Sequence, residues 1–502
     1  MALPFFELAT ASLILFVLSH IIKNYASPLS KIPNAGFGAA FSRLIWAFPR
    51  EYSGTLTLEL PKLHDKLGPL IRIGPNEVSF YSRETYETVH KVGSRDPKEH
   101  AKRRRIMAQL FSRSKVPNIE KLISSHVERL VNKLQHEVLH INLCTAARAL
   151  EADIMSEFSF GTSIRAIDCW ASGKQLAMVE KNDEMATWMP MVCHAMTPYL
   201  TNFPLLCTLW EQLEQHLFHL TGFRTQYTKG LAEFKQWCRR SWQSVLSADP
   251  EGITGDLGSP NLIETLCNAG LPAETALSEA SENLGPGTDT TSGTLAHILW
   301  ALAHNPAYQD ALYRDLEAVN FSSDMTTLEG VARLQACVKE GIRWAATAAA
   351  MLPRIVPPGG IELHGKFIPE GTILTSSPIW YLHDKTAYPD PELYDPFRWL
   401  TEDAKDLSQD SLRDRFYIPF SRGANICLGA HFAYLELYIS ISQIVRNFRL
   451  KPSNPTQVVK HEEWNLVPLP KRREWVAAVP VDNLGVITHP RHRRATSTEV
   501  IS

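Results

Sequence analysis

The chain lacks an excess of charge of either sign, with 51 basic and 53 acidic residues among its 502. No global field therefore draws it to nucleic acid. Its eight cysteines include no C-x-x-C pair, which argues against a zinc site and a secreted disulfide framework and favours a reducing compartment. The chain also has no internal repeat and no glycine-rich fingerprint of a flavin or NAD domain. If its chemistry needs electrons, they must come from a partner.

Long apolar runs are scarce, and the clearest one lies at the N-terminus, from Leu3 to Ile22. About 20 residues suffice for a helix to cross a bilayer. No lysine or arginine precedes the run, whereas Lys23 and Lys31 follow it. The positive-inside rule then places the remainder of the chain in the cytoplasm. The run is therefore predicted to be a single-pass membrane anchor.

Beyond that run the pattern is mostly helical. Alternating residues predict strands at 70–74, 77–81, 361–369 and 372–375, and helical spacing dominates over 84–350. The sequence thus predicts a mainly α fold with a small β region in one domain. We expect the boundaries 1–25 for the anchor, 26–36 for a proline-rich connector, 37–485 for a single catalytic domain and 486–502 for a disordered tail.

One cysteine, Cys427, lies in a short glycine-bracketed turn before an apolar helical run, Ala430–Ile441. A helix N-terminus favours a thiolate through its free N–H groups and the positive end of its dipole. Gly423 and Gly429 let the backbone pass close to a large flat ligand, and Phe420 offers an aromatic wall. Haem iron accepts an axial cysteine thiolate. The alternative from the loop alone is a buried structural cysteine in a glycine-rich turn.

This loop, F-S-R-G-A-N-I-C-L-G, resembles the haem-binding loop of the cytochrome P-450 family. Glu340-Gly-Ile-Arg343 and the later Pro-Phe-Arg398-Trp resemble, in order and wording, the family's K-helix and meander arginine. The resemblance implies a cytochrome P-450 fold that binds haem b, with Cys427 as the iron ligand. It also implies that Glu340, Arg343 and Arg398 form a buried charge cluster of structural role behind the haem loop.

A long helical pattern, Thr275–His304, contains Gly-Pro286-Gly-Thr-Asp289-Thr290. Taken alone, Gly-Pro-Gly is typical of a turn between two helices. The segment resembles the family's distal helix, which implies that Thr290 hydrogen-bonds the bound dioxygen and that Asp289 feeds protons from solvent. Pro286 stands where the family usually has a small residue, so we expect a kink and a wider groove.

His297 in the same helix is expected to be a packed residue, because Cys427 already serves as the iron ligand.

The loop departs from the family at Asn425, where an arginine normally pairs with a haem propionate. His100, Arg104 and Arg354 resemble the other propionate ligands of the family. The basic run Lys102–Arg105 also permits a nucleic-acid patch. Because the overall charge is balanced, we interpret the run as a face for an acidic reductase domain.

A further departure concerns the cover of the distal pocket. The segment Thr85–Gly93 is followed almost at once by Asp96–His100, where related sequences carry a long loop. Either the pocket is unusually open, or the sequence has lost a segment.

Two functions follow from these patterns. The first is a monooxygenase of the endoplasmic reticulum membrane that inserts one oxygen atom of O2 into an apolar small molecule. Its electrons would come from NADPH through NADPH-cytochrome P-450 reductase. The wording around Lys339–Arg343 resembles filamentous-fungal members, many of which tailor secondary metabolites. The alternative is a haem-binding relative with impaired turnover and a scaffold role, favoured by Asn425, Pro286 and the short segment after Gly93.

Overall fold

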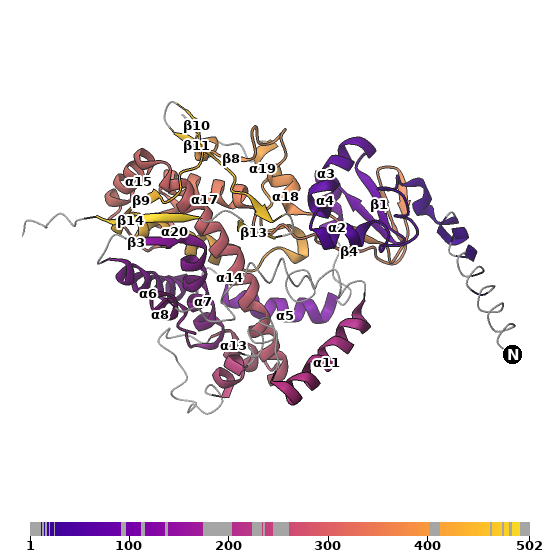
Figure 1. Ribbon diagram of the computed structural model, residues 1–502, viewed down its shortest axis with the longest axis horizontal. Coiled ribbons are helices and arrows are strands. Elements are labelled where there is room, and N and C mark those ends of the chain that lie inside the picture. Colours follow the sequence, from indigo (N-terminus) through magenta and orange to yellow (C-terminus); the bar gives the residue numbers. More distant parts are fainter. Residues whose placement is uncertain are drawn as a thin grey trace, which may run out of the picture.

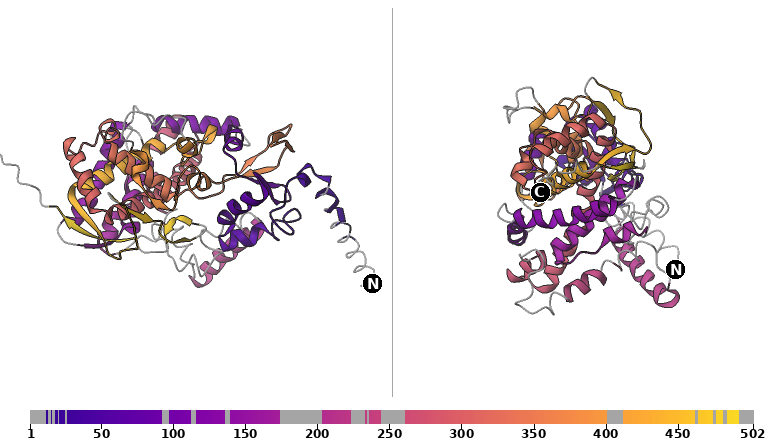
Figure 2. Two further views of the ribbon diagram at one scale, coloured as in Figure 1. Left: turned by 90° about the horizontal axis from the view of Figure 1, so that it is seen from above. Right: turned by 90° about the vertical axis from the view of Figure 1, so that its left-hand side faces the viewer.

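The computed structural model describes residues 21–24, 26–91, 97–111, 116–135, 139–173, 203–222, 236–243, 261–400, 412–461, 464–473, 476–480 and 484–491, with the single residues 12, 15, 18, 19 and 233. A large helical part and a smaller part rich in strands lie side by side (Figure 1). The 3-10 helix η1 (Pro28–Lys31) and strand β14 (Gly485–Pro490) lie toward opposite ends of the long axis (Figures 1 and 2).

The smaller part is built on a four-stranded sheet of order β1-β2-β7-β4. Strands β1 (Leu70–Gly74) and β2 (Glu77–Phe80) are antiparallel, and β2 pairs in parallel with β7 (Ile373–Thr375). Every residue of β1 and β2 is buried, because helices cover the sheet. The strands predicted at 70–74 and 77–81 are confirmed. The sheet ends in β4 (Arg354–Ile355), and β5 (Ile361–Leu363) with β6 (Lys366–Ile368) forms a separate hairpin.

The proline-rich connector is part of this smaller core and not a free spacer. Leu29 and Ile32 are 1% and 2% exposed and pack with the apolar residues of the sheet. The buried Arg72 of β1 donates a hydrogen bond of 2.7 Å to Asn24 Oδ1. The chain is therefore held to the globule at Asn24, Leu29 and Ile32.

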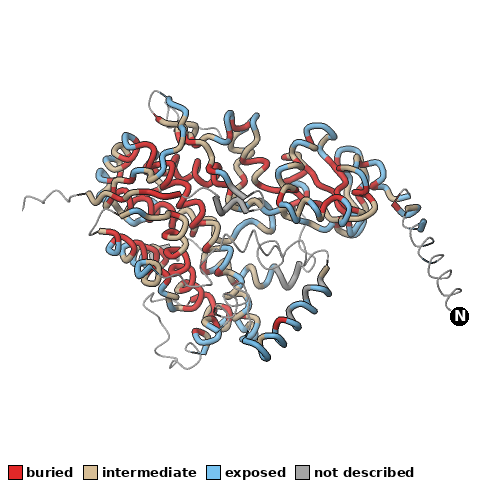
Figure 3. The backbone as a smooth tube through the Cα atoms, viewed as in Figure 1, coloured by how far each residue is buried: buried red, intermediate tan, exposed pale blue. Residues whose placement is uncertain are grey.

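The helical part is organised around α14 (Ala273–Ala303), which packs along α7 (Leu143–Phe160) and against α17 (Ala332–Ala345) and α20 (Ala430–Asn447). Helix α14 continues through Pro286, so the turn that Gly-Pro-Gly taken alone would indicate does not form. A Cβ at Gly287 would lie 2.5 Å from Met155 Cε. Glycine there lets α14 approach α7 closely, and any side chain at this position would displace the end of Met155. The most continuously buried backbone follows these helices (Figure 3).

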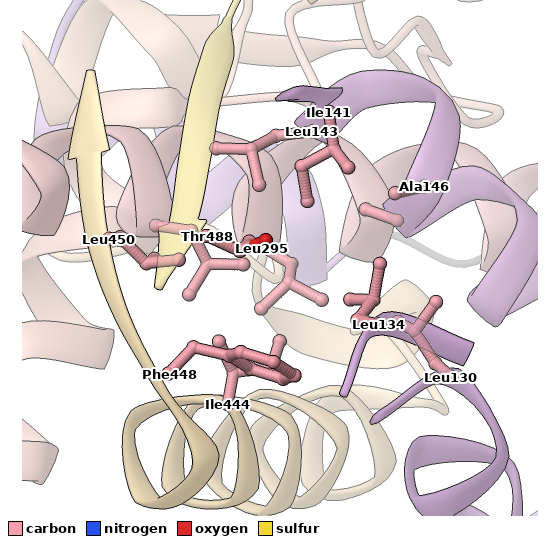
Figure 4. A pocket seen from close by; sticks show the side chains of 12 residues that line it. Leu130, Leu134, Ile141, Leu143, Ala146, Leu295, Ile444, Phe448, Leu450 and Thr488 are labelled. Carbon is pink, nitrogen blue, oxygen red and sulfur yellow. The ribbon is translucent and has the colours of Figure 1, made fainter. Parts of the chain in front are cut away.

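Strand β14 corrects the prediction for the C-terminal tail. Residues 485–490 pair on one side with β3 (Leu139–Asn142) and on the other with β9 (Phe448–Pro452). Val486 is fully buried, so the expectation of disorder is wrong for these residues, while residues 492–502 lie outside the described part. Beneath this sheet an apolar cavity of about 20 Å³ is lined mainly by leucines and isoleucines (Figure 4). A void of that character stays dry.

The other helices and strands complete the described chain. They are α2 (Ala47–Ser53), α3 (Leu56–Leu67), α4 (Arg83–Lys91), α5 (Pro97–Leu110), α6 (Val116–Leu134), α8 (Ala166–Ala171), α11 (Pro204–Thr221), α13 (Leu262–Asn268), α15 (Pro306–Ala318), α16 (Met325–Glu329), α18 (Pro378–Leu382), η3 (Pro396–Trp399), α19 (Leu412–Phe416), η4 (Gly423–Asn425), β8 (Leu393–Tyr394), β10 (Val459–Lys460), β11 (Asn465–Pro468), β12 (Arg472–Arg473) and β13 (Val476–Pro480).

Two expectations fall largely outside the described residues. Within the described part, no helix combines the length and the apolar character that crossing a membrane requires. Most of residues 3–22 are not among those described, so the anchor stays a prediction. The segment that would cover the distal pocket falls between α4 and α5, and residues 92–96 are likewise outside the described part.

The predicted charge cluster forms at the end of α17. Arg343 donates two hydrogen bonds of 2.8 Å to the two carboxylate oxygens of Glu340, and both side chains are fully buried. Arg398 donates to Glu340 Oε1 at 3.0 Å, and the Trp399 indole donates to Oε2 at 2.8 Å. Arg343 also donates to the carbonyls of Leu382, Pro391 and Leu393. The pair thus fixes the irregular chain between α18 and η3.

Glu340→Gln is expected to lower the free energy of unfolding by about 3–5 kcal/mol, because it leaves the Arg343 guanidinium buried without its counter-charge. Arg333→Ala on the same helix is the matched control, since it removes a partly exposed pair with Asp315 and a contact with the Tyr308 ring, and it should cost about 1 kcal/mol. Chemical unfolding followed by circular dichroism measures both. Equal losses in the two variants would contradict the structural role of the cluster.

Candidate active site

A cavity of about 470 Å³ lies where α14, α20, the chain after α17 and the Cys427 loop meet. Six residues predicted for the site line this one cavity: Thr290, Cys427, Phe420, Gly429, Arg104 and Arg354. Two other predicted residues, Asp289 and Gly423, are not among the residues that line it. The backbone of His100 belongs to α5, but its side chain lies outside the described part of the structure.

The cysteine loop places the thiol at the wall of the cavity, just before α20. The Cys427 N–H donates to the Phe420 carbonyl at 2.9 Å, and the Phe420 ring packs against Tyr434 with centroids 5.5 Å apart. Burial raises the pKa of the Cys427 thiol, while the Gly429 N–H and the Arg104 guanidinium lower it. The expectation that the helix terminus alone favours the thiolate is therefore incomplete, because desolvation is the larger effect.

The two loop glycines serve different purposes. Gly423 has φ of 76°, a left-handed conformation that other residues adopt only with strain. Gly429 has φ of −83°, and a Cβ there would meet Phe111 at 3.9 Å and Cys427 Sγ at 4.0 Å. The backbone of the protein therefore does not require glycine at 429. Its lack of a side chain instead leaves room on the cavity side, where a flat ligand would approach Cys427.

Thr290 lines the cavity from α14, and its hydroxyl already has a partner. Thr290 Oγ1 donates to the Pro286 carbonyl at 2.8 Å. The next residue toward the N-terminus, Asp289, forms an ion pair of 3.0 Å with Arg148 of α7. The side chains of the predicted proton donor and its acid are thus both held by other groups. His297 is a packed residue, as expected: it is fully buried, with Nδ1 2.6 Å from the Gly293 carbonyl and its ring edge-on to Trp344.

Cationic groups gather at another part of the same cavity. Arg104 donates to the carbonyl of Ile426 within the cysteine loop. The buried Nε of Arg354 has no hydrogen-bond partner among the described residues. The side-chain oxygen of Asn425 also has none there. Burial lowers the pKa of both arginines, as expected for cations that lack a full set of anionic partners. The cavity therefore has room and positive charge for an anionic ligand.

Sequence reasoning missed two acids near this cavity. Glu436 of α20 lines it, and Glu151 of α7 lies against Glu436 in the core. Arg148, the partner of Asp289, was also missed. The only signal in the sequence is a charged residue within an otherwise apolar helical run, and such a residue does not reveal its partner on another helix.

A thiol open to a large apolar cavity, faced by a threonine-bearing helix and accompanied by one unpartnered arginine N–H group, is a site of the haem-thiolate class. The chain belongs to the cytochrome P-450 family, whose model matches residues 63–476. Members of that family are oxidoreductases that hold haem iron through a cysteine thiolate. The residues of this cavity fit that group, because Gly429 leaves space beside Cys427 and because Arg354 and Arg104 supply positive charge for propionates.

Curated relatives cover nearly the whole chain. A cytochrome P-450 monooxygenase of Penicillium terrestre is 27% identical over 91% of this chain and 96% of its own length. A fusicoccadiene C-8 hydroxylase of Alternaria brassicicola is 26% identical over 86% of this chain and 88% of its own. A tryptophan 6-hydroxylase of Fusarium equiseti is 26% identical over 87% and 89%. The chain is thus similar to fungal monooxygenases along its length.

Asn425→Arg is expected to slow haem loss about tenfold or more, because a hydrogen bond to a charged group contributes about 1.5–3 kcal/mol. Ala424→Arg is the matched control, since it adds the same charge at an exposed neighbouring position. Transfer of haem to an excess of apo-globin measures the rate. A rate unchanged or raised in Asn425→Arg would show that Arg104 and Arg354 already satisfy the propionates.

Proposed function

We propose that this chain is a monooxygenase that inserts one oxygen atom of O2 into an apolar small molecule, with electrons from NADPH delivered by a separate reductase. The observation that carries the proposal is that Cys427 and Thr290, which come from different elements, line one cavity. The remaining wall is largely apolar, with Phe111, Met155, Leu352 and other carbon-rich side chains. Such a wall excludes water and favours an apolar substrate.

Haem, when bound, supplies the activation of dioxygen, and the chain supplies the surroundings. Cys427 is the residue placed to ligate the iron. Thr290 is placed to orient a hydrogen bond in the cavity, and Asp289 is the acid that can renew the proton from outside it. For either to act, the Thr290 hydroxyl must leave the Pro286 carbonyl or share its proton, and Asp289 must exchange Arg148 for water.

The relatives support a class of substrate. Their names include hydroxylases of fusicoccadiene and of tryptophan, both small organic molecules. We propose an intermediate of fungal secondary metabolism as the substrate. Within the cavity, the Asn283 amide has a buried Nδ2 with no hydrogen-bond partner among the described residues. It is placed to bind an acceptor oxygen and so to orient a mostly apolar substrate.

A second candidate, a haem-binding relative with impaired turnover, is favoured by three observations. The hydroxyl of Thr290 is bonded to the Pro286 carbonyl, Asp289 is paired with Arg148, and the position of the usual loop arginine holds Asn425, whose oxygen lacks a partner. The amount of product formed per NADPH consumed separates the two functions. A purified enzyme that consumes NADPH with its reductase and forms only peroxide and water would support the second.

We place the protein at the endoplasmic reticulum membrane, with its catalytic domain in the cytoplasm. The support is the apolar run of residues 3–22 and the outward face of α11, which lies apart from the helical core (Figures 1 and 3). That face exposes Leu205, Leu206, Leu209, Leu213 and Leu220. An exposed row of leucines is typical of a surface that meets lipid. Fractionation of cells that express the full chain and a chain without residues 1–25 tests this placement.

Cys427→Ala is expected to abolish the red-shifted absorption band of the reduced, CO-bound protein, because that band requires a thiolate on the iron. Cys169→Ala is the control, since Cys169 lies on α8 and not in the cavity. Persistence of the band in Cys427→Ala would overturn the assignment of the ligand. A parent protein that gives no such band would overturn the haem-thiolate function itself.

Thr290→Ala is expected to leave haem bound but to divert reducing equivalents from product to peroxide and water, since the proton donor in the cavity is lost. Thr290→Ser keeps the hydroxyl and should restore coupling. The measurement is peroxide released and product formed per NADPH consumed, with the reductase in excess. Coupling that is unchanged in Thr290→Ala would mean that the hydroxyl serves only its bond to the Pro286 carbonyl.

A further inference from the structure

Two glutamates meet inside the helical core with no cation between them. Glu151 of α7 and Glu436 of α20 are 0% and 1% exposed. Their carboxyl groups lie close enough to shift each other's pKa, and the Thr291 hydroxyl of α14 also lies beside Glu436. Three helices therefore close around this acid pair, defined as Glu151 and Glu436.

The ion pairs that the described cations of these and neighbouring helices form are with other acids. Arg148 pairs with Asp289, Arg129 with Asp168 and Asp153, His126 with Glu157, and Arg343 and Arg398 with Glu340. As carboxylates, neither glutamate can donate to the other. Both oxygens of Glu151 and Oε1 of Glu436 would then be buried without a donor.

A shared proton removes this conflict. One protonated carboxyl can donate to the other, and two carboxylates that share a dry site cannot both ionise. Burial raises the pKa of Glu151 to about 8. Burial and the neighbouring Glu151 raise the pKa of Glu436 well above its ordinary value. The acid pair therefore holds at least one proton at neutral pH, and it releases a proton only above the ordinary pH range of a glutamate.

Other titratable groups on the elements around the acid pair must be considered in any pH effect. They are Arg148, Asp153 and Glu157 on α7, Asp289 and His297 on α14, His431, Tyr434 and Tyr438 on α20, Glu340 and Arg343 on α17, His126 on α6, Glu264 on α13, and Arg104 and Cys427 at the cavity. Among the described residues, the pKa values of the acid pair are shifted by burial, by the two acids themselves and by Thr291.

Glu436 lines the same cavity as Cys427 and lies on α20, the helix that follows the cysteine loop. A charge that appears or disappears at such a site acts through a medium of low dielectric constant, so it changes the potential at a cofactor in the cavity. The reverse also holds by linkage, because a negative charge added in the cavity raises the proton affinity of the acid pair.

We propose that Glu151 and Glu436 couple reduction of the haem in this cavity to the uptake of a proton. One electron enters the cavity from the reductase, or from dithionite in the test, and the acid pair takes one proton from solvent, so that no net charge is added. This inference rests on the haem-binding part of the proposed function and not on turnover of any substrate. The acid pair acts only by changing its own charge, and the proposal does not require it to contact the substrate.

The sign of the pH dependence follows from this coupling. Below the range in which the oxidised protein releases the proton, the acid pair is already protonated, and reduction takes up nothing. As the pH rises through that range, reduction requires a proton that is increasingly scarce, so the midpoint potential falls. One proton per electron corresponds to a slope of about 59 mV per pH unit.

The test is a spectroelectrochemical titration of the substrate-free holoenzyme across about pH 6 to 10, which brackets the pKa of buried glutamates. The parent should show a falling potential over the alkaline part of this range, and Glu151→Gln and Glu436→Gln should each lose most of the slope. Glu157→Gln is the matched control, because Glu157 lies on α7 but pairs with His126. A parent potential that does not change with pH, or a slope retained in both glutamine variants, would overturn the proposal.

Infrared difference spectra between oxidised and reduced parent protein provide a second readout that needs no variant to fold. Reduction at alkaline pH should produce the C=O band of a newly protonated carboxylic acid, and the band should shift in D2O. If no such band forms, the proposal fails even where a variant does not retain haem. These outcomes can be told apart from those of the proposed function. An enzyme that forms no product but keeps the pH dependence of its midpoint potential supports this inference. An enzyme that forms product but lacks that pH dependence contradicts this inference and leaves the proposed function intact.

Discussion

The buried ion pair between Glu340 and Arg343 is the interaction on which the geometry of the cysteine loop depends. Its remaining hydrogen-bonding capacity fixes the irregular chain that ends in η3. That chain is in turn joined to the segment before the loop, because the Tyr388 hydroxyl donates to the Arg413 carbonyl at 2.7 Å. Tyr417 then bonds to Tyr434 of α20 at 2.8 Å. Irregular backbone has no regular pattern of backbone hydrogen bonds. A buried arginine that donates hydrogen bonds to several of its carbonyls is therefore an effective way to hold it.

Desolvation is the common electrostatic theme of the cavity. It opposes the thiolate of Cys427, the guanidinium groups of Arg104 and Arg354, and the carboxylates of the acid pair. Each group is therefore poised to respond to a charge placed among them. A cofactor with a metal cation and carboxylates would pair its cation with the thiolate and its carboxylates with the arginines. The acid pair instead avoids a buried double negative charge by keeping a proton. The cavity thus favours a charged cofactor because its buried thiol and arginines lack counter-charges within the protein.

Two departures from the family pattern have consequences that the structure makes specific. Pro286 does not break α14, yet its carbonyl receives the hydroxyl of Thr290. Asn425 leaves its side-chain oxygen without a partner beside the cavity, while Arg104 donates to the neighbouring Ile426 carbonyl. The Thr290 bond goes to a backbone carbonyl that any residue at 286 would offer, whereas Asn425 leaves the cavity without the charge of an arginine at that position. Neither residue closes the cavity, so a change in haem retention is a more direct consequence than loss of the fold.

Local patterns were sufficient to predict strands β1, β2 and β7 of the first sheet, the helix that carries Glu340 and Arg343 at i and i+3, and the turn that presents Cys427. These features depend on residues close together in the chain, whose periodicity and backbone preferences are visible in the sequence. The acid pair, the bond from Arg148 to Asp289 and the pairing of β14 with β3 were not predictable in this way. Each joins segments far apart in the sequence, and a charged residue in an apolar run has no local mark of its partner. Only the packing of α7, α14 and α20 decided which of those charges are paired, which share a proton and which face the cavity.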